Sequence, residues 1–365
     1  MSTPIAGCIR LSDPSELIAA VPHLLGFYPH DSIVVVALHG KKLGLTMRAD
    51  LVGAEHAAAL AEQLLRPIIR QGPTGVALVV IGGTPTPDAV PPHRVVVDAL
   101  HEVLARTGLP VLVAAWTPET VHGAVWRCYH DPLCGGTVAD PATSPLAAAT
   151  VAAGAVTFSS REEMIGLLTA DDAASLQRRA LLLEAADAEH PLSAGLVRRR
   201  IARLRDLHRA AAAGTLHLSD SVVAEVGSAL CDHRVRDACL PWCSGRGAAA
   251  AEQLWLALVR ATPAPERAEP AALLAFTAYL RGNGALAGAA LDVAAQACPE
   301  HSLSGLLRAA LDAALPPHLL RQIAADAAAA VQRPRRRPKR RQMIVTLRPW
   351  TRVSRTRGRK SRRLR

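Results

Sequence analysis

Aromatic residues are scarce in this sequence. Phe, Trp and Tyr make up 3% of the 365 residues, whereas hydrophobic residues make up 50%. Much of the apolar share is alanine, so the core must be built from small and branched side chains, which favours close-packed helices. The scarcity draws attention to Phe27 and Tyr28, which stand together between Gly26 and the turn-forming residues 29–32, directly before an apolar run.

Long hydrophobic runs are also lacking. The most apolar segments, such as residues 145–156, are rich in alanine and shorter than the ~20 residues that cross a bilayer. The N-terminus has neither the basic start nor the apolar stretch of a secretory signal. We therefore expect a cytoplasmic protein with no membrane partner.

Acidic residues are absent from the C-terminal segment 333–365. This segment holds 16 of the 42 Lys and Arg residues, which leaves 26 basic against 31 acidic residues in the first 332. The positive formal charge of +11 therefore comes from the C-terminal segment, and the rest of the chain is mildly acidic. Arginines interrupted by prolines cannot form a core, so we expect a disordered tail over 331–365. Such a cationic arm either associates nonspecifically with nucleic acid through residues 333–365 or is an extension without consequence.

The order of the elements indicates an α/β domain followed by an all-helical domain. Uniformly apolar, β-branched runs alternate with amphipathic segments in the first third of the chain, which predicts a mixed, mostly parallel sheet with flanking helices. We expect an α/β sandwich domain over 1–135, a linker over 136–158, and a helical domain over 159–330 with a tetratricopeptide-like hairpin near 270–299. The predicted strands span residues 32–38, 43–48, 75–81, 109–116 and, at an edge, 124–129.

Several short motifs resemble a known family. These are Leu24–Phe27 with Pro29, Asp31–Ser32 and the strand after it, then Arg48–Leu51, Trp126, Tyr129, Cys134, Gly136–Thr137, Ser160–Glu163 and Arg236–Asp237. Over residues 11–320 the chain is similar to the family called domain of unknown function 4192, found mainly in actinomycete-type bacteria. The resemblance implies no assigned chemistry. The tight cysteine cluster typical of the family after the Trp/Tyr strand is replaced here by Cys128 and a single Cys134.

Four polar residues are predicted to converge at one end of the sheet. Asp31 and Ser32 precede the first strand, and Arg48 and Asp50 end the hairpin strand that runs back beside it. One interpretation is a polar pocket in which Arg48 binds a small anionic ligand. The alternative is that turn caps and an Arg48–Asp50 ion pair fix the end of the hairpin.

Seven cysteines, an odd number in a chain of this length, favour reduced thiols. Cys128, His130 and Cys134 lie at the end of the aromatic edge strand or shortly after it and suggest a thiol nucleophile beside a base, although packing of that strand is the favoured explanation. Cys231, His233, Cys239 and Cys243 have spacings that approach those of a zinc site, but they fall on helical sequence and also suit a buried helix face. We predict no cofactor.

Three functions follow from these candidates. The first is an uncharacterised, non-catalytic module that binds a small anionic ligand or a protein partner. The alternatives are an enzyme that uses Cys128, His130 and Cys134, and nucleic-acid association through the basic tail.

Overall fold

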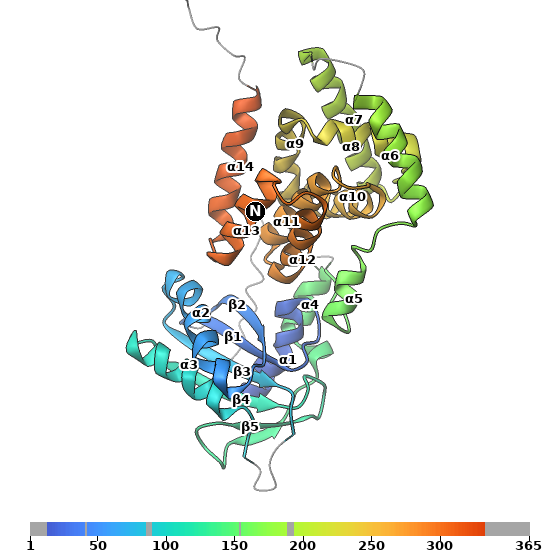
Figure 1. The fold of residues 1–365 in the computed structure, drawn as a ribbon. Coiled ribbons are helices and arrows are strands. Elements are labelled where there is room, and N and C mark those ends of the chain that lie inside the picture. Colours follow the sequence, from blue (N-terminus) through green and yellow to red (C-terminus); the bar gives the residue numbers. More distant parts are fainter. Residues whose placement is uncertain (1–12, 41, 85–89, 153–154, 188–192, 333–365) are drawn as a thin grey trace, which may run out of the picture. The chain divides into compact units, whose positions relative to one another are not determined.

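The computed structural model describes residues 13–40, 42–84, 90–152, 155–187 and 193–332, and of 326–332 the backbone alone. An α/β half comes first and a helical half follows (Figure 1). Of the tail predicted to be disordered, 331–365, residues 331–332 belong to helix α14 (Pro317–Gln332), and 333–365 lie outside the described residues. None of the described helices is both long and apolar enough to span a bilayer.

The α/β half contains one six-stranded sheet in the order β2-β1-β3-β4-β5-β6. The long strands form where the sequence is β-branched and apolar, and β1 and β3 are buried along almost their whole length. The strand bounds are β1 Ser32–His39, β2 Lys42–Asp50, β3 Gly75–Ile81, β4 Val111–Thr117, β5 Val125–Cys128 and β6 Gly135–Thr137.

The sheet is mixed, as predicted, but the expectation of mostly parallel pairing is wrong. Only β3 and β4 pair in parallel, whereas β1 pairs antiparallel with both β2 and β3, and β4–β5 and β5–β6 are antiparallel. The hairpin places β2 at the edge, so the connection through α2 crosses β1 and adds β3 on its other side. Strands β2 and β3 run in the same direction, but β1 lies between them, so they do not pair.

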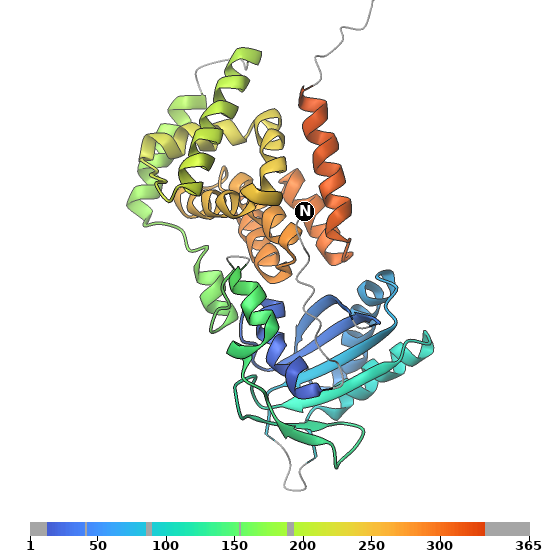
Figure 2. The ribbon, with the colours of Figure 1, turned by 180° about the vertical axis from the view of Figure 1, so that it is seen from behind.

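Helices cover both faces of this sheet (Figures 1 and 2). The buried side chains of α2 (Ala57–Arg70) and α3 (Arg94–Arg106) pack with alternate residues of β1 and β3, including Ile33 and Leu78. The intervening residues, including Val34 and Val79, face the opposite side together with α1 (Pro14–Leu25). The alternation follows from the two-residue period of a strand and yields a three-layer arrangement.

The segment predicted as a linker, residues 136–158, contains ordered structure. It holds the end of β6, a 3-10 turn at Pro141–Thr143 and α4 (Pro145–Ala152), which contacts α1. The short helix α5 (Arg161–Gly166) follows, capped by the Ser160 side chain, which accepts from the amide of Glu163.

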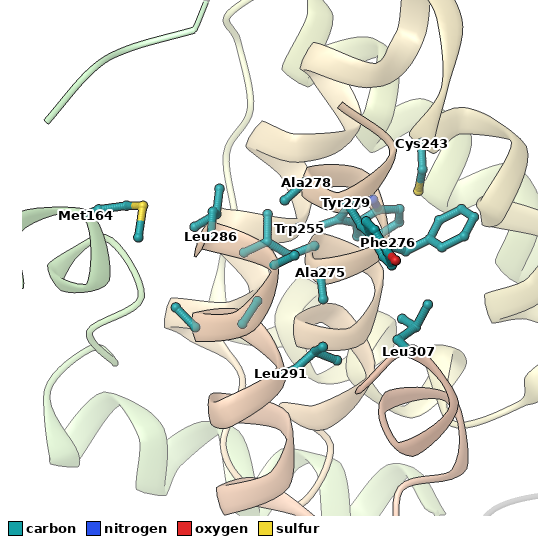
Figure 3. Close-up of a cluster of buried hydrophobic side chains, with 14 of the residues drawn as sticks. Met164, Cys243, Trp255, Ala275, Phe276, Ala278, Tyr279, Leu286, Leu291 and Leu307 are labelled. Carbon is teal, nitrogen blue, oxygen red and sulfur yellow. The ribbon is translucent and has the colours of Figure 1, made fainter. Parts of the chain in front are cut away.

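The helical half contains the remaining helices and the predicted hairpin. Helices α11 and α12 pack against each other and are separated by Gly282 and Asn283, whose side chain caps α12. Around Trp255, Phe276 and Leu291 their core is made largely of alanine and leucine (Figure 3), in line with the composition. The helices are α6 Ala173–Asp187, α7 Ala194–Ala212, α8 Asp220–Leu230, α9 His233–Cys239, α10 Ala248–Ala261, α11 Ala268–Arg281, α12 Gly284–Ala297, α13 Ser302–Asp312 and α14 Pro317–Gln332.

Candidate functional site

Three of the four residues predicted to converge do meet. The register of the hairpin pairs Ser32 with Asp50 and places Arg48 two residues before it. Arg48 Nε donates to Ser32 Oγ at 2.7 Å, and Arg48 Nη2 lies 2.6 Å from Asp50 Oδ1. Asp50 thus neutralises Arg48 within the hairpin, which matches the ion-pair interpretation and leaves little unpaired positive charge at Arg48.

Asp31 faces the other neighbour of β1. Its backbone has φ +41°, a left-handed value that is uncommon outside glycine, and its carbonyl accepts from the Leu51 amide at 2.9 Å. Its carboxylate lies over Gly82, the residue after β3, where an added Cβ would come within 2.5 Å of Asp31 Oδ1. The Asp31 carboxylate therefore lies at the end of β3, whereas its carbonyl stays bonded to the residue after β2.

Gly82 allows this close approach. It has φ +111°, and a Cβ there would lie 3.0 Å from Asp31 Cα. Its amide donates to the Thr117 carbonyl at 3.0 Å, and its own carbonyl accepts from Trp116 Nε1 at 2.7 Å. The backbones that end β3 and β4 are thereby fixed at the carboxyl end of the one parallel pair, the end where open α/β sheets bind ligands.

An open pocket lies beside this end of the sheet. Its volume is about 450 Å³, and its lining comes from the loop after β2, Leu51–Ala54, and from the start of α3, His93–Val96. The size falls within the range of small-molecule sites. Leu51, Val52 and Val95 supply apolar surface on both walls.

Arg94 is the arginine among the residues that line the pocket. Its Nη2 donates to the Tyr129 carbonyl at 2.7 Å, and the guanidinium lies 5.8 Å from the centroid of the Tyr129 ring. Tyr129 is itself anchored, because its hydroxyl donates to the Pro92 carbonyl at 2.6 Å. No carboxylate among the described residues forms an ion pair with Arg94, in contrast to Arg48.

Backbone amides add to this charge. Helix α3 begins after His93, whose φ is +59° and whose side chain does not cap the helix. The amides of Val96 and Val97 donate to the His93 carbonyl, whereas those of Arg94 and Val95 donate to no other described residue. The N-terminus of α3, which lines the pocket, is also the positive end of the helix dipole. This wall of the pocket therefore favours an anion.

The predicted thiol site is only partly assembled. Cys128 donates its amide to the Cys134 carbonyl at 3.0 Å, which places the two cysteines opposite each other. His130 instead lies near His101, with 5.4 Å between the ring centroids. Burial, followed by the neighbouring Cys134 and Asp131, raises the pKa of Cys128 to about 12, whereas an activated nucleophile needs a lowered pKa.

The residues predicted as a metal site are not brought together as a metal-binding set. Cys231 and His233 are exposed, whereas Cys239 and Cys243 are buried in the core of the helical half. Nowhere in the described parts of the chain do three His, Cys, Asp or Glu side chains cluster as metal ligands would. Successive helical turns around 231–243 point these side chains to different sides, and burial raises the pKa of Cys239 well above its usual value.

A family model for a domain of unknown function, DUF4192, matches residues 14–318. The chain belongs to this family. The match covers both the sheet and most of the helical half of this DUF4192 protein. No curated protein and no solved structure matches the chain.

Sequence reasoning missed the pocket itself. Its two walls are about 40 positions apart in the chain, and each is a loop or helix start without a recognised motif. The signal available was His93–Arg94 at the beginning of an amphipathic helix that follows a proline-rich loop. That signal indicates a pocket only once α2 and α3 are known to pack side by side on one face of the sheet.

Proposed function

We propose that this DUF4192 protein is a non-catalytic binding module whose α/β half takes a small organic anion in the pocket between Leu51–Ala54 and His93–Val96. The observation that carries the proposal is Arg94. It is an arginine that lines a pocket of about 450 Å³, has no ion-pair partner among the described carboxylates, and has its guanidinium hydrogen-bonded to the Tyr129 carbonyl. The anionic ligand predicted from the sequence is thereby moved from Arg48 to this neighbouring position.

The lining indicates the chemical class of the ligand. Apolar side chains on both walls suit a hydrophobic body, while the Arg94 guanidinium and the amides of Arg94 and Val95 suit a carboxylate or a phosphate. A guanidinium held in place by a carbonyl and an aromatic ring loses little conformational entropy on binding. A ligand with both features should therefore bind better than inorganic phosphate alone.

One acidic group limits the charge of the ligand. The Glu55 carboxylate folds back over Gly53, where an added Cβ would come within 2.4 Å of Glu55 Oε1. Gly53 lines the wall opposite Arg94. A second negative group that reached Gly53 would approach this carboxylate, so we expect selection for a single anionic group.

Thermal shift with phenyl phosphate tests the proposal. We expect the melting temperature of the wild-type protein to rise with phenyl phosphate, to rise less with inorganic phosphate, and to stay unchanged with benzyl alcohol. Ligand that binds only the folded state stabilises it by mass action. Arg94→Ala should abolish the response to phenyl phosphate relative to its own melting temperature without ligand.

Two further variants locate the site. Arg106→Ala removes an exposed arginine from the last turn of the same helix, where it pairs with Glu62, and should leave the response intact. Arg48→Ala should also leave it intact. Loss of the response in Arg48→Ala together with its retention in Arg94→Ala would move the ligand to the hairpin and refute the pocket.

A further inference from the structure

Cys128 and Cys134 occupy directly opposed positions in the edge hairpin of the sheet. The pairs Trp126–Gly136 and Arg127–Gly135 set the register of β5 and β6, and the next pair in this register is Cys128 with Cys134. The Cys128 amide donates to the Cys134 carbonyl at 3.0 Å, so the register continues beyond the end of β6. Residues directly opposite each other in an antiparallel pair project to the same face of a sheet.

This geometry suits a disulfide. One bond joins the pair, because the Cys134 amide donates to the Asp131 carbonyl instead of to Cys128. Opposed residues in antiparallel strands have Cα atoms ~4.5–5.5 Å apart, within the ~4.4–6.8 Å range that a disulfide spans. Both side chains are partly buried and pack against the same hydrophobic cluster. The Cys134 thiol is close enough to contribute, after burial, to the raised pKa of Cys128.

We propose that Cys128 and Cys134 are a redox-modification site that closes to an intramolecular disulfide when the protein meets hydrogen peroxide. One thiolate attacks the peroxide oxygen, which breaks the O–O bond, forms a sulfenic acid and releases the first water. The other thiol then attacks the sulfenic sulfur and expels a second water. In total two S–H bonds are replaced by one S–S bond, and the peroxide accepts the two electrons. A dithiol reductant reverses the change by thiol–disulfide exchange.

The other close pair of cysteines offers a contrast. Cys239 and Cys243 are four residues apart at the end of α9, and both side chains are buried in the helical core. Their thiols donate to backbone carbonyls, Cys239 to Val235 at 3.3 Å and Cys243 to Cys239 at 3.8 Å. Peroxide cannot reach them while the helices are folded, so we expect oxidation to be confined to the hairpin.

The sequence makes the test direct, because no Lys or Arg lies between Arg127 and Arg161. Trypsin therefore releases both hairpin cysteines in one peptide, residues 128–161. The full-length native protein is treated with hydrogen peroxide, alkylated with iodoacetamide under denaturing conditions, digested and analysed by mass spectrometry. We expect an unalkylated 128–161 peptide that is lighter than the reduced peptide by two hydrogens, with at least a tenfold loss of the doubly alkylated form.

Controls separate the disulfide from other oxidation. Dithiothreitol before alkylation should restore the doubly alkylated peptide, and Cys134→Ser should abolish the light peptide, whereas Cys298→Ser should retain it. Circular dichroism establishes that each variant is folded. A doubly alkylated 128–161 peptide after peroxide treatment, irreversible oxidation of either thiol, or a disulfide from this peptide to another cysteine would each overturn the proposal. None of these outcomes depends on whether the pocket binds an anion.

Discussion

The Arg94 guanidinium donates a 2.7 Å hydrogen bond to the Tyr129 carbonyl and lies 5.8 Å from the centroid of the Tyr129 ring. The start of α3 is thereby connected to the residue that follows β5. Tyr129 is buried, and burial, opposed by Arg94, raises the pKa of its hydroxyl. The hydroxyl thus stays protonated at neutral pH and donates to Pro92. The cation of the proposed site is therefore positioned by the edge of the sheet.

Substitution at Gly82 should disturb the carboxyl end of the parallel strands. In Gly82→Ala the new Cβ would press against the Asp31 backbone, and φ +111° strains any side chain, so we expect a loss of about 2–3 kcal/mol in the free energy of unfolding. Urea denaturation measures it. Gly40→Ala is the matched control, because Gly40 also has a positive φ, +62°, but no atom within 4 Å of the new Cβ. There we expect a loss of only about 1 kcal/mol, and equal losses would show that crowding at Asp31 is unimportant.

Arg179 should be the most costly arginine to remove from the helical half. Its Nε lies 2.7 Å from Asp220 Oδ1, its Nη1 lies 2.8 Å from Asp171 Oδ2, and the side chain is 10% exposed. Arg179→Ala leaves two carboxylates without this cation and should reduce the free energy of unfolding by about 2 kcal/mol or more. Arg178→Ala is the control, since Arg178 also contacts Asp220 but is 59% exposed. A loss from Arg178→Ala as large as that from Arg179→Ala would contradict this account.

The Asp220 carboxylate should make stability depend on acid pH. Hydrogen bonds from Arg179 and Arg178 hold the pKa of Asp220 below its usual range. A lowered pKa in the folded state contributes stability above the unfolded value of about 3.9, and that contribution is lost as pH falls through the folded pKa. Wild type should therefore exceed Asp220→Asn in stability by a constant margin from neutral pH to about 5, and the margin should shrink below about 4. A margin that persists into stronger acid would exclude the carboxylate charge as its cause.

Cys128 should be a slow nucleophile. Burial and its neighbours raise its pKa to about 12, so the thiolate fraction at pH 8 is far below that of a free cysteine. We expect iodoacetamide to label Cys128 in the folded, reduced protein at least ~10 times more slowly than a cysteine in a short peptide. Peptide mapping of residues 128–161 over time gives the rate. Labelling faster than that of the peptide would restore the hypothesis of an enzymatic thiol. Slow attack also means that disulfide closure should need more time near neutral pH than in mild alkali.

Much of the local structure could be predicted from sequence because local signals decide it. The apolar runs that became β1 and β3, and the turn at His39–Gly40 between β1 and β2, fix the hairpin. Its register in turn brings Arg48 and Asp50 back beside Ser32. The partner of a strand is a tertiary choice, however, and the sequence does not state on which side of β1 the next strand will join.

The remaining features depend on contacts between distant segments. Strand β6 is Gly-Gly-Thr, too short and too rich in glycine to be recognised, so the opposition of Cys128 and Cys134 could not be seen. Sequence proximity groups Cys128 and Cys134 with His130, but it does not show that the two cysteines lie opposite each other. The pocket likewise depends on the packing of α2 beside α3, which brings together two loops that carry no shared pattern.

The most direct test of the proposed site is a titration of the ¹⁵N-labelled protein with phenyl phosphate, followed through the backbone amide signals of Arg94 and Val95. We predict saturable chemical-shift changes at these two amides at constant ionic strength, and their loss in Arg94→Ala. Unchanged signals at both positions, or changes that an equal concentration of chloride reproduces, would contradict binding in this pocket.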